Sequence, residues 1–190
     1  MASTSDIRKG LCIKYSNDIY SIVEFQHVKP GKGAAFVRTK LKSLSTGRVI
    51  DNTFPSGHKI ETVRVERRKF QYLYKEEMGY CFMDNETFEQ IYLQEHMIGN
   101  VGFLLPSLEV EILFNTEESK PVPLQVDMPQ YIIAEIIYTE PGVKGDTATN
   151  TLKPAKIETE AEIKVPLFIN EGDKVKIETE TGNYMERVRD

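Results

Sequence analysis

Lys32 is the residue of this sequence whose surroundings are best suited to chemistry on a partner molecule. It lies in the segment Lys29-Pro30-Gly31-Lys32-Gly33, where a glycine on each side leaves no neighbouring side chain to pack along its stem. Pro30 and Gly31 occupy the two central positions that favour a type II turn. We therefore expect Lys32 at the tip of a β-hairpin, with its ammonium group presented outward. An ordinary surface lysine in a turn is the alternative that these residues leave open.

The remaining reactive side chains form no recognisable catalytic or metal-binding motif. Cys12 and Cys81 are far apart and have no second cysteine or histidine at metal-ligand spacing, so we expect two buried free thiols. The three histidines have no serine or cysteine nearby in a recognisable nucleophile motif, although triad members can be far apart in sequence. The glycines around Lys32 lack the spacing and the following Ser or Thr of a Walker phosphate loop. We expect no metal, no cofactor and no enzymatic activity.

Strand patterns surround the Lys32 turn and recur along the chain. Residues 20–25, 109–114 and 174–179 largely alternate apolar and polar side chains, and residues 131–138 form the more continuous apolar run of a central strand. Turn formers such as Gly, Pro, Asn and Asp separate these runs at short intervals. Residues 85–98 are the exception, because their apolar side chains have some helical spacing. The sequence predicts an all-β protein with one short helix at 85–98.

Two changes in composition divide the chain into three modules. The sequence changes from basic to acidic near residues 60–65, and prolines bracket a short strand pattern at 124–128. We therefore expect modules at residues 1–63, 64–127 and 128–190. Modules of this size are typical of small SH3-like and OB barrels, which close or nearly close their sheets and so reduce the exposure of strand edges.

The three modules differ in charge. The first holds ten Lys and Arg against five Asp and Glu, whereas the second holds six against twelve and the third eight against twelve. The overall net charge of −5 therefore hides a basic first module. The basic side chains that we expect to face a phosphate backbone are Lys29, Lys32, Arg38, Lys40, Lys42 and Arg48. Chance variation between small modules is the alternative explanation of this asymmetry.

No apolar run reaches the roughly 18 residues that a membrane-spanning helix needs. The segment Met1–Asp6 lacks the basic and apolar regions of a signal peptide. We expect a cytoplasmic, monomeric protein that makes no contact with a membrane.

A series of short segments, in order along the chain, resembles the bacterial translation elongation factor P family. Val28–Phe36 is similar to the family's N-terminal loop, in which the lysine between two glycines is enzymatically extended and points at the acceptor end of peptidyl-tRNA. The other similar segments are Asn85–Gln90, Pro141–Ala148, Lys153–Ala155, Val165–Ile169, Gly172–Lys176 and Thr181–Val188. The resemblance spans essentially the whole chain, and the ordered set is more specific than any one segment.

The resemblance implies an all-β fold of three small β-barrel domains in an L-shaped, tRNA-like arrangement. These are an SH3-like (KOW-like) domain at 1–63 and OB-type domains at 64–127 and 128–190. It also implies binding to the ribosome between the peptidyl and exit tRNA sites, and faster peptide bond formation at stalled consecutive prolines through positioning of peptidyl-tRNA. The implied partners are the ribosome, ribosomal RNA, peptidyl-tRNA and a lysine-modifying enzyme. A paralogous factor and a general OB-fold RNA-binding protein are the alternatives.

Carried over residue by residue, the resemblance makes Lys32 the modified residue that faces the peptidyl transferase centre. The residues that form its tip are Lys29, Pro30, Gly31 and Gly33. The residues implied in RNA contact are Arg38, Gly145, Asp146, Thr147, Tyr184 and Arg187. The chain departs from the family at Thr149–Leu152, where glycines are usual, and at Thr159–Glu162, where a Thr-Gly turn is common. At the first departure Asn150 is the candidate for a left-handed backbone position.

Overall fold

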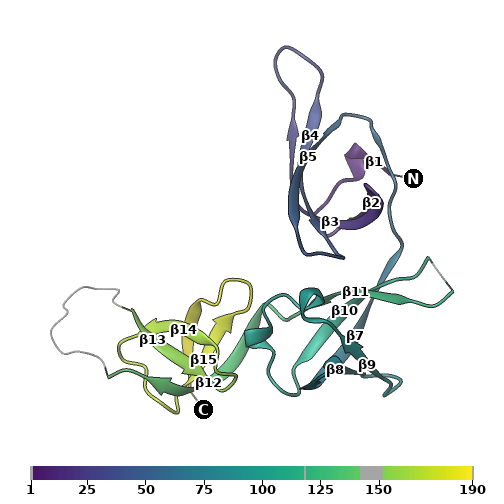
Figure 1. Ribbon diagram of the computed structural model, residues 1–190. Coiled ribbons are helices and arrows are strands. Elements are labelled where there is room, and N and C mark those ends of the chain that lie inside the picture. The colour runs from purple at the N-terminus through teal and green to yellow at the C-terminus, as the bar shows by residue number, and fades with distance from the viewer. Residues whose placement is uncertain (1, 118, 142–151, 190) are drawn as a thin grey trace. The chain divides into compact units, whose positions relative to one another are not determined.

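The computed structural model describes residues 2–117, 119–141 and 152–189 (Figure 1). Within these ranges the secondary structure consists of strands and three short 3-10 turns, without an α-helix. The strands are β1 Ala2–Ser3, β2 Cys12–Tyr15, β3 Asp18–Val28, β4 Phe36–Ser43, β5 Val49–Pro55, β6 Lys59–Ile60, β7 Val65–Glu76, β8 Gly79–Asp84, β9 Gln90–Leu93, β10 Glu109–Asn115, β11 Val122–Asp127, β12 Tyr131–Thr139, β13 Leu152–Ile157, β14 Glu162–Pro166, β15 Lys174–Glu178 and β16 Tyr184–Val188. The 3-10 turns are η1 Thr4–Asp6, η2 Glu95–Met97 and η3 Val101–Phe103. The all-β prediction is confirmed.

The strands form four sheets, with orders β1-β6, β2-β3-β4-β5, β11-β10-β7-β8-β9 and β14-β13-β12-β15-β16. The chain divides into two compact units. One comprises Met1–Arg68 with Ile112–Val126, and the other comprises Lys69–Glu111 with Asp127–Asp190.

The sheet β2-β3-β4-β5 carries the segment that contains Lys32. β3 and β4 pair in antiparallel register from Tyr20 opposite Ser43 to Val28 opposite Phe36. Burial alternates along most of β4, so that Val37 and Leu41 enter the core while Arg38 and Lys40 face solvent. The core beneath this sheet consists of Ile7, Ile13, Ile22, Val37, Leu41, Phe54 and Ile60. The β3–β4 hairpin is therefore anchored by a packed core at one end and is free at the other.

The segment 85–98 does not form the predicted helix. Residues 85–89 form a turn between β8 and β9, Gln90–Leu93 is a strand, and only Glu95–Met97 makes a single 3-10 turn. The side chain of Asp84 accepts hydrogen bonds from the backbone N–H groups of Glu86 and Thr87, at 2.7 and 3.1 Å. Such side-chain bonds favour a turn over a helix. Antiparallel pairing of β9 with β8 then takes the backbone groups that a helix would have used.

The predicted central strand at 131–138 corresponds to β12, which pairs with β15 on one side and β13 on the other. Its inward side chains Ile132, Ala134 and Ile136 lie in a core that also contains Ile157, Val175 and Ile177. Phe103 from η3 belongs to the same core and lies against Gly182, where a Cβ atom would come within 3.1 Å of the ring. Gly182 also has a φ of 73°, and this left-handed backbone together with the close packing favours glycine at this position.

Cys12 and Cys81 are both buried free thiols, as predicted. No helix in the described part of the chain is long and apolar enough to cross a membrane.

Candidate functional site

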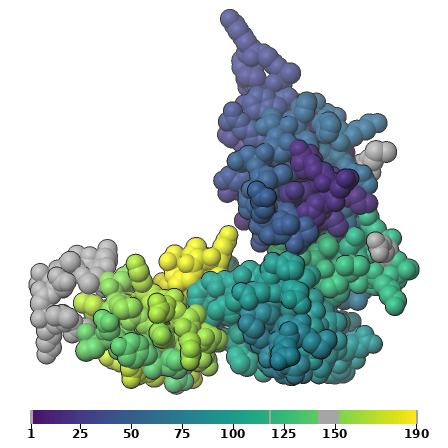
Figure 2. All heavy atoms as spheres, in the orientation of Figure 1, coloured from purple at the N-terminus to yellow at the C-terminus, as the bar shows by residue number. Residues whose placement is uncertain are grey.

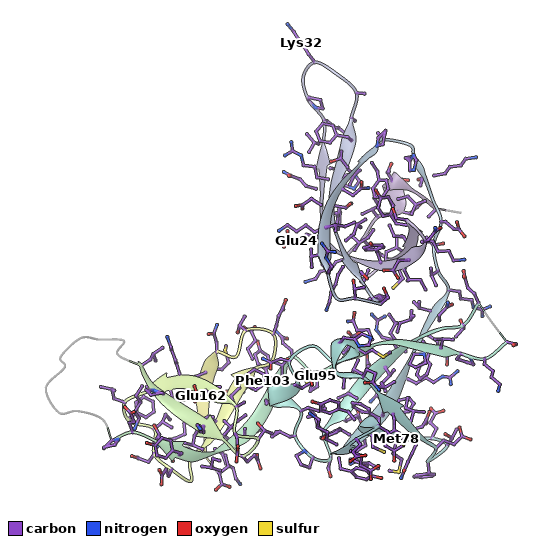
Figure 3. All side chains as sticks on the ribbon, viewed as in Figure 1. Glu24, Lys32, Met78, Glu95, Phe103 and Glu162 are labelled. Atoms are coloured by element: carbon purple, nitrogen blue, oxygen red, sulfur yellow. The ribbon has the colours of Figure 1, made fainter. Side chains whose placement is uncertain are left out.

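Lys32 lies at the end of the β3–β4 hairpin, in the connection of residues 29–35, which we call the tip loop (Figure 3). Lys29, Pro30, Gly31, Lys32 and Gly33 are all exposed. Among the described residues, neither Lys29 nor Lys32 has a hydrogen bond or ion pair. The loop stands out from the surface of the first sheet (Figure 2). The ammonium group of Lys32 is therefore available to a partner molecule.

The tip loop is not the predicted type II turn. Such a turn requires a positive φ at Gly31, whereas positive φ in this loop occurs at Gly33, at 118°. The strands stop pairing at Val28 and Phe36, and the long connection that remains does not need a tight two-residue turn. A Cβ atom added at Gly31 would meet no heavy atom within 4 Å. The two glycines thus have different roles. Gly33 adopts a backbone angle that other residues rarely adopt, whereas Gly31 leaves open space beside the loop.

This difference predicts opposite outcomes for two alanine variants. We expect Gly33→Ala to disturb the tip loop, because a φ of 118° lies outside the regions that L-residues adopt and costs on the order of 1–3 kcal/mol. Gly31→Ala should leave the loop close to its original conformation. Backbone amide chemical shifts of residues 28–36 would measure both effects. Equal shifts in the two variants would contradict the assignment of the backbone requirement to Gly33.

Arg38 and Lys40 lie on the same solvent-exposed face of β4, but they differ in the charges that surround them. Lys40 lies opposite Glu24 on β3, at 2.9 Å between Nζ and Oε2, and this hydrogen bond raises the pKa of Lys40. Arg38 lies opposite Gln26 and Thr53, neither of which carries a charge. Its guanidinium group stands 5.5 Å from the centroid of the Phe36 ring. Of these two cations, Arg38 is thus the one that no carboxylate neutralises within the described chain.

The six basic residues expected to face phosphate do not form one cluster. Lys29 and Lys32 lie in the tip loop, Arg38, Lys40 and Lys42 lie on β4, and Arg48 follows β4. At about 3.3 Å per residue, the length of β4 separates Arg48 from the tip. A shallow groove of about 360 Å³ lies along β3, β4 and β5, and Glu24, Arg38, Lys40 and Asp51 line it. Sequence reasoning missed the two carboxylates in this groove, because their place depends on strand register.

Tyr184 and Arg187 lie on β16. Tyr184 is half-buried and packs against the core of its sheet, and this burial raises the pKa of its hydroxyl. Arg187 contacts Asp173, with 3.7 Å between Nη1 and Oδ2, and its guanidinium carbon is 5.8 Å from the centroid of the exposed Phe168 ring. The side chains of Arg187 and Asp173 are 34% and 24% exposed, so water screens their attraction. Arg187 is thus held loosely and remains accessible.

The other residues implied in RNA contact, Gly145, Asp146 and Thr147, lie outside the described residues, as does Asn150. At the second departure from the family, Glu160 has a φ of 65° in the turn between β13 and β14. A left-handed residue therefore stands where the family commonly has glycine after threonine.

Three family models match this chain in succession. Residues 3–60 match "Elongation factor P (EF-P) KOW-like domain". Residues 65–122 match "Elongation factor P (EF-P) OB domain", and residues 132–187 match "Elongation factor P, C-terminal". Together the three models cover most of the chain.

Curated relatives are similar over their whole length. The chain is 61% identical over 189 residues to "Elongation factor P" of Flavobacterium psychrophilum, with 100% of both proteins covered. It is 58% identical over 190 residues to the proteins of the same description from Flavobacterium johnsoniae and Christiangramia forsetii, again with 100% of each covered. Among solved structures, "Eukaryotic translation initiation factor 5A from Methanococcus jannaschii" is 23% identical with a TM-score of 0.49, over 65% of this chain and 92% of that chain.

Proposed function

This chain belongs to the elongation factor P family, and on that premise we propose that it binds the ribosome between the peptidyl and exit tRNA sites and restarts synthesis at consecutive prolines. The family places it among the factors of translation. The observation that carries the finer proposal is the exposed tip loop, whose Lys32 has no partner within the described chain. A cation offered at the end of a long hairpin suits a negatively charged cleft.

The proposed mechanism is positioning. Proline is a poor participant in peptide bond formation, because its ring fixes φ and restricts how the nascent chain can lie. Holding the acceptor end of peptidyl-tRNA in a reactive geometry lowers the entropic part of the barrier. Lys32 would supply reach and positive charge beside the acceptor end, and Arg38 would hold a phosphate further down the same hairpin. No proton transfer by the protein is required.

We assign the domains as residues 1–63, 64–127 and 128–190. The matched ranges 3–60, 65–122 and 132–187 support this division. We further propose that the chain acts as a cytoplasmic monomer, that it contacts ribosomal RNA and peptidyl-tRNA, and that a lysine-modifying enzyme acts on Lys32. The third domain would contact tRNA through Tyr184 and Arg187, and Gly145, Asp146 and Thr147 would also bind RNA.

A reconstituted translation system tests the function directly. Two reporters would be compared, one with three consecutive prolines and one in which alanines replace them. Adding the purified chain should raise the yield of the first and leave the second unchanged. Cosedimentation with ribosomes, against free RNA of similar length, separates this function from that of a general OB-fold RNA-binding protein. Equal stimulation of both reporters, or equal binding to free RNA, would contradict the proposal.

A charge variant tests the proposed contact at the third domain. We expect Arg187→Glu to weaken ribosome affinity by about tenfold at low salt, because it replaces an attraction to phosphate by a repulsion. Arg187→Gln should weaken affinity less, and its effect should fade as salt screens the lost attraction. Asp173→Asn is the matched control, since it frees Arg187 and keeps an oxygen that can accept from the N–H of Asn170. Unchanged affinity in Arg187→Glu would rule out the contact.

A further inference from the structure

The segment 61–64, which joins β6 to β7, contains the assigned boundary between the first and second domains. Backbone hydrogen bonds tie this segment to β2, an edge strand of the first sheet. The N–H of Lys14 donates to the carbonyl of Glu61 at 2.8 Å. Two residues further on, the N–H of Val63 donates to the carbonyl of Cys12 at 3.0 Å. One side of the segment therefore belongs to the first sheet.

The other side of the segment is bonded to the connection between β10 and β11. The N–H of Thr116 donates to the carbonyl of Arg64 at 3.0 Å, and the N–H of Arg64 donates to Oε1 of Glu117 at 3.5 Å. Ile112–Val126 belongs to the same compact unit as the first sheet. Within this unit, the first sheet and the β10–β11 hairpin thus meet at one short segment.

A small apolar cluster lies at the same place. Its buried members are Cys12, Leu44, Val63 and Leu113, against seven buried residues in the core beneath the first sheet. Hydrophobic attraction is non-directional, so a cluster of four residues holds the two parts together without setting the angle between them. Contacts with a defined direction are needed to set that angle.

Lys14 supplies a direct link between the two parts. Its Nζ lies 2.9 Å from Oε2 of Glu117 in the β10–β11 connection and 3.3 Å from Oε1 of Glu61 beside β2. The hydrogen bonds to Glu117 and Glu61 raise the pKa of Lys14, and the bond from Lys14 lowers the pKa of Glu117. One ammonium group is thus held between two carboxylates on different elements, and a change of angle would break the pair with Glu117.

The bridge acts on direction more than on stability, because exposed ion pairs contribute little to the free energy of unfolding. Lys14 lies opposite Ile19 near the start of β3, whereas the tip loop follows Val28 at the other end of that strand (Figure 1). At about 3.3 Å per residue, β3 forms an arm of about 30 Å between them. A rotation of about 4° at the bridge would move the tip loop by about 2 Å over an arm of this length.

We propose that Lys14 is a positioning residue for Lys32. By bridging Glu61 and Glu117 it fixes the angle between the first sheet and the β10–β11 hairpin, and so keeps the tip loop directed at the acceptor end of peptidyl-tRNA. A displacement of about 1 Å at a reacting group can cost on the order of 100-fold in rate, so activity should be sensitive to this angle. This inference rests on the proposed function, because that function requires Lys32 to be aimed.

Pulsed electron paramagnetic resonance on the isolated chain tests the bridge without ribosomes. Spin labels on Thr53→Cys in β5 and Val122→Cys in β11 report the distance between the first sheet and the hairpin, since both positions are exposed. The native Cys12 and Cys81 are buried and stay unlabelled. Lys14→Met removes the charge and keeps the apolar stem, and we expect it to broaden the distance distribution by about 2 Å, the displacement expected for the arm. An unchanged distribution would overturn the inference.

Matched variants separate the two carboxylates. Glu117→Gln breaks the pair that crosses to the hairpin, while its amide oxygen can still accept from the N–H of Arg64, and it should broaden the distribution as Lys14→Met does. Glu61→Gln breaks only the pair inside the first domain and should have a smaller effect. High salt should broaden the distribution of the unaltered chain and leave Lys14→Met unchanged. A larger effect of Glu61→Gln than of Glu117→Gln would contradict the bridge.

The three-proline reporter tests the consequence for activity. Lys14→Met should lower the rescue by about tenfold with unchanged thermal unfolding, whereas Lys14→Arg, which keeps the charge, should retain both the activity and the narrow distance distribution. Lys59→Met, which removes an exposed lysine of β6 from the same compact unit, is the control and should match the unaltered chain. Full rescue by Lys14→Met despite a broadened distribution would overturn the positioning role. Failure of the unaltered chain to rescue would instead defeat the proposed function, and the distance measurement would still decide the bridge.

Discussion

Lys32→Ala should abolish the rescue of polyproline synthesis and leave the fold unchanged. The side chain is exposed in the tip loop, so its removal costs little stability. The loss of activity should be large, because misplacing a reacting group by about 1 Å can cost on the order of 100-fold in rate. Thermal unfolding and the reporter with three prolines would be measured on the same preparation.

Two further variants test whether any positive charge in the tip loop suffices for activity or whether residue 32 must be a lysine. Lys29→Ala removes an equally exposed cation from the same loop and should keep most of the activity. Lys32→Arg keeps the charge but loses the primary amine that a lysine-modifying enzyme needs, so we expect it to behave like Lys32→Ala. Full rescue by Lys32→Ala would falsify the role of Lys32.

The second large effect concerns covalent modification. We expect Lys32, in protein isolated from its native host, to carry an extension that ends in a positive charge. The physical reason is reach, because a hairpin cannot insert its own bulk into a crowded RNA cleft, whereas a longer flexible arm can. Additional amines would keep the cation and add donors to phosphate or ribose oxygens. The exposure of residues 29–33 makes Lys32 accessible to a modifying enzyme.

Mass spectrometry of a peptide that spans Lys29 to Arg38 should show a mass above the encoded value, localised to Lys32. Unmodified recombinant protein should be less active in the three-proline reporter by about tenfold or more. The alternative is that the bare ammonium group suffices. An unshifted peptide from native cells, together with full activity, would establish that alternative.

Much of the fold could be predicted from local pattern. The alternation predicted at 174–179 corresponds to β15, in which Val175 and Ile177 are buried while Lys174 is exposed, because a strand turns successive side chains to opposite faces. The continuous apolar run at 131–138 is the central strand β12, paired on both sides. The family resemblance, confirmed over the whole chain, rests on short segments that are contiguous in sequence.

Prediction from local pattern was wrong where hydrogen bonds to another segment of the chain determine the secondary structure. Residues 85–98 have some helical spacing, but pairing of β9 with β8 and the buried carboxylate of Asp84 make a turn and a strand. Phe88, one of the apolar side chains in that spacing, is exposed at a positive φ. The signal for a turn was Asp84, whose side chain can accept hydrogen bonds from the backbone of the residues that follow it.

The sequence by itself determined the all-β class, the charge of each module and the presence of Lys32 between two glycines. These properties depend on residue type and on neighbours a few positions away. Only the tertiary structure decided that Gly33 and not Gly31 takes the positive φ, because the length of the tip loop depends on where β3 and β4 stop pairing. It also decided that Glu24 neutralises Lys40 while Arg38 keeps its charge free. That outcome depends on cross-strand register, which joins residues distant in sequence and leaves no signature in the residues around either cation.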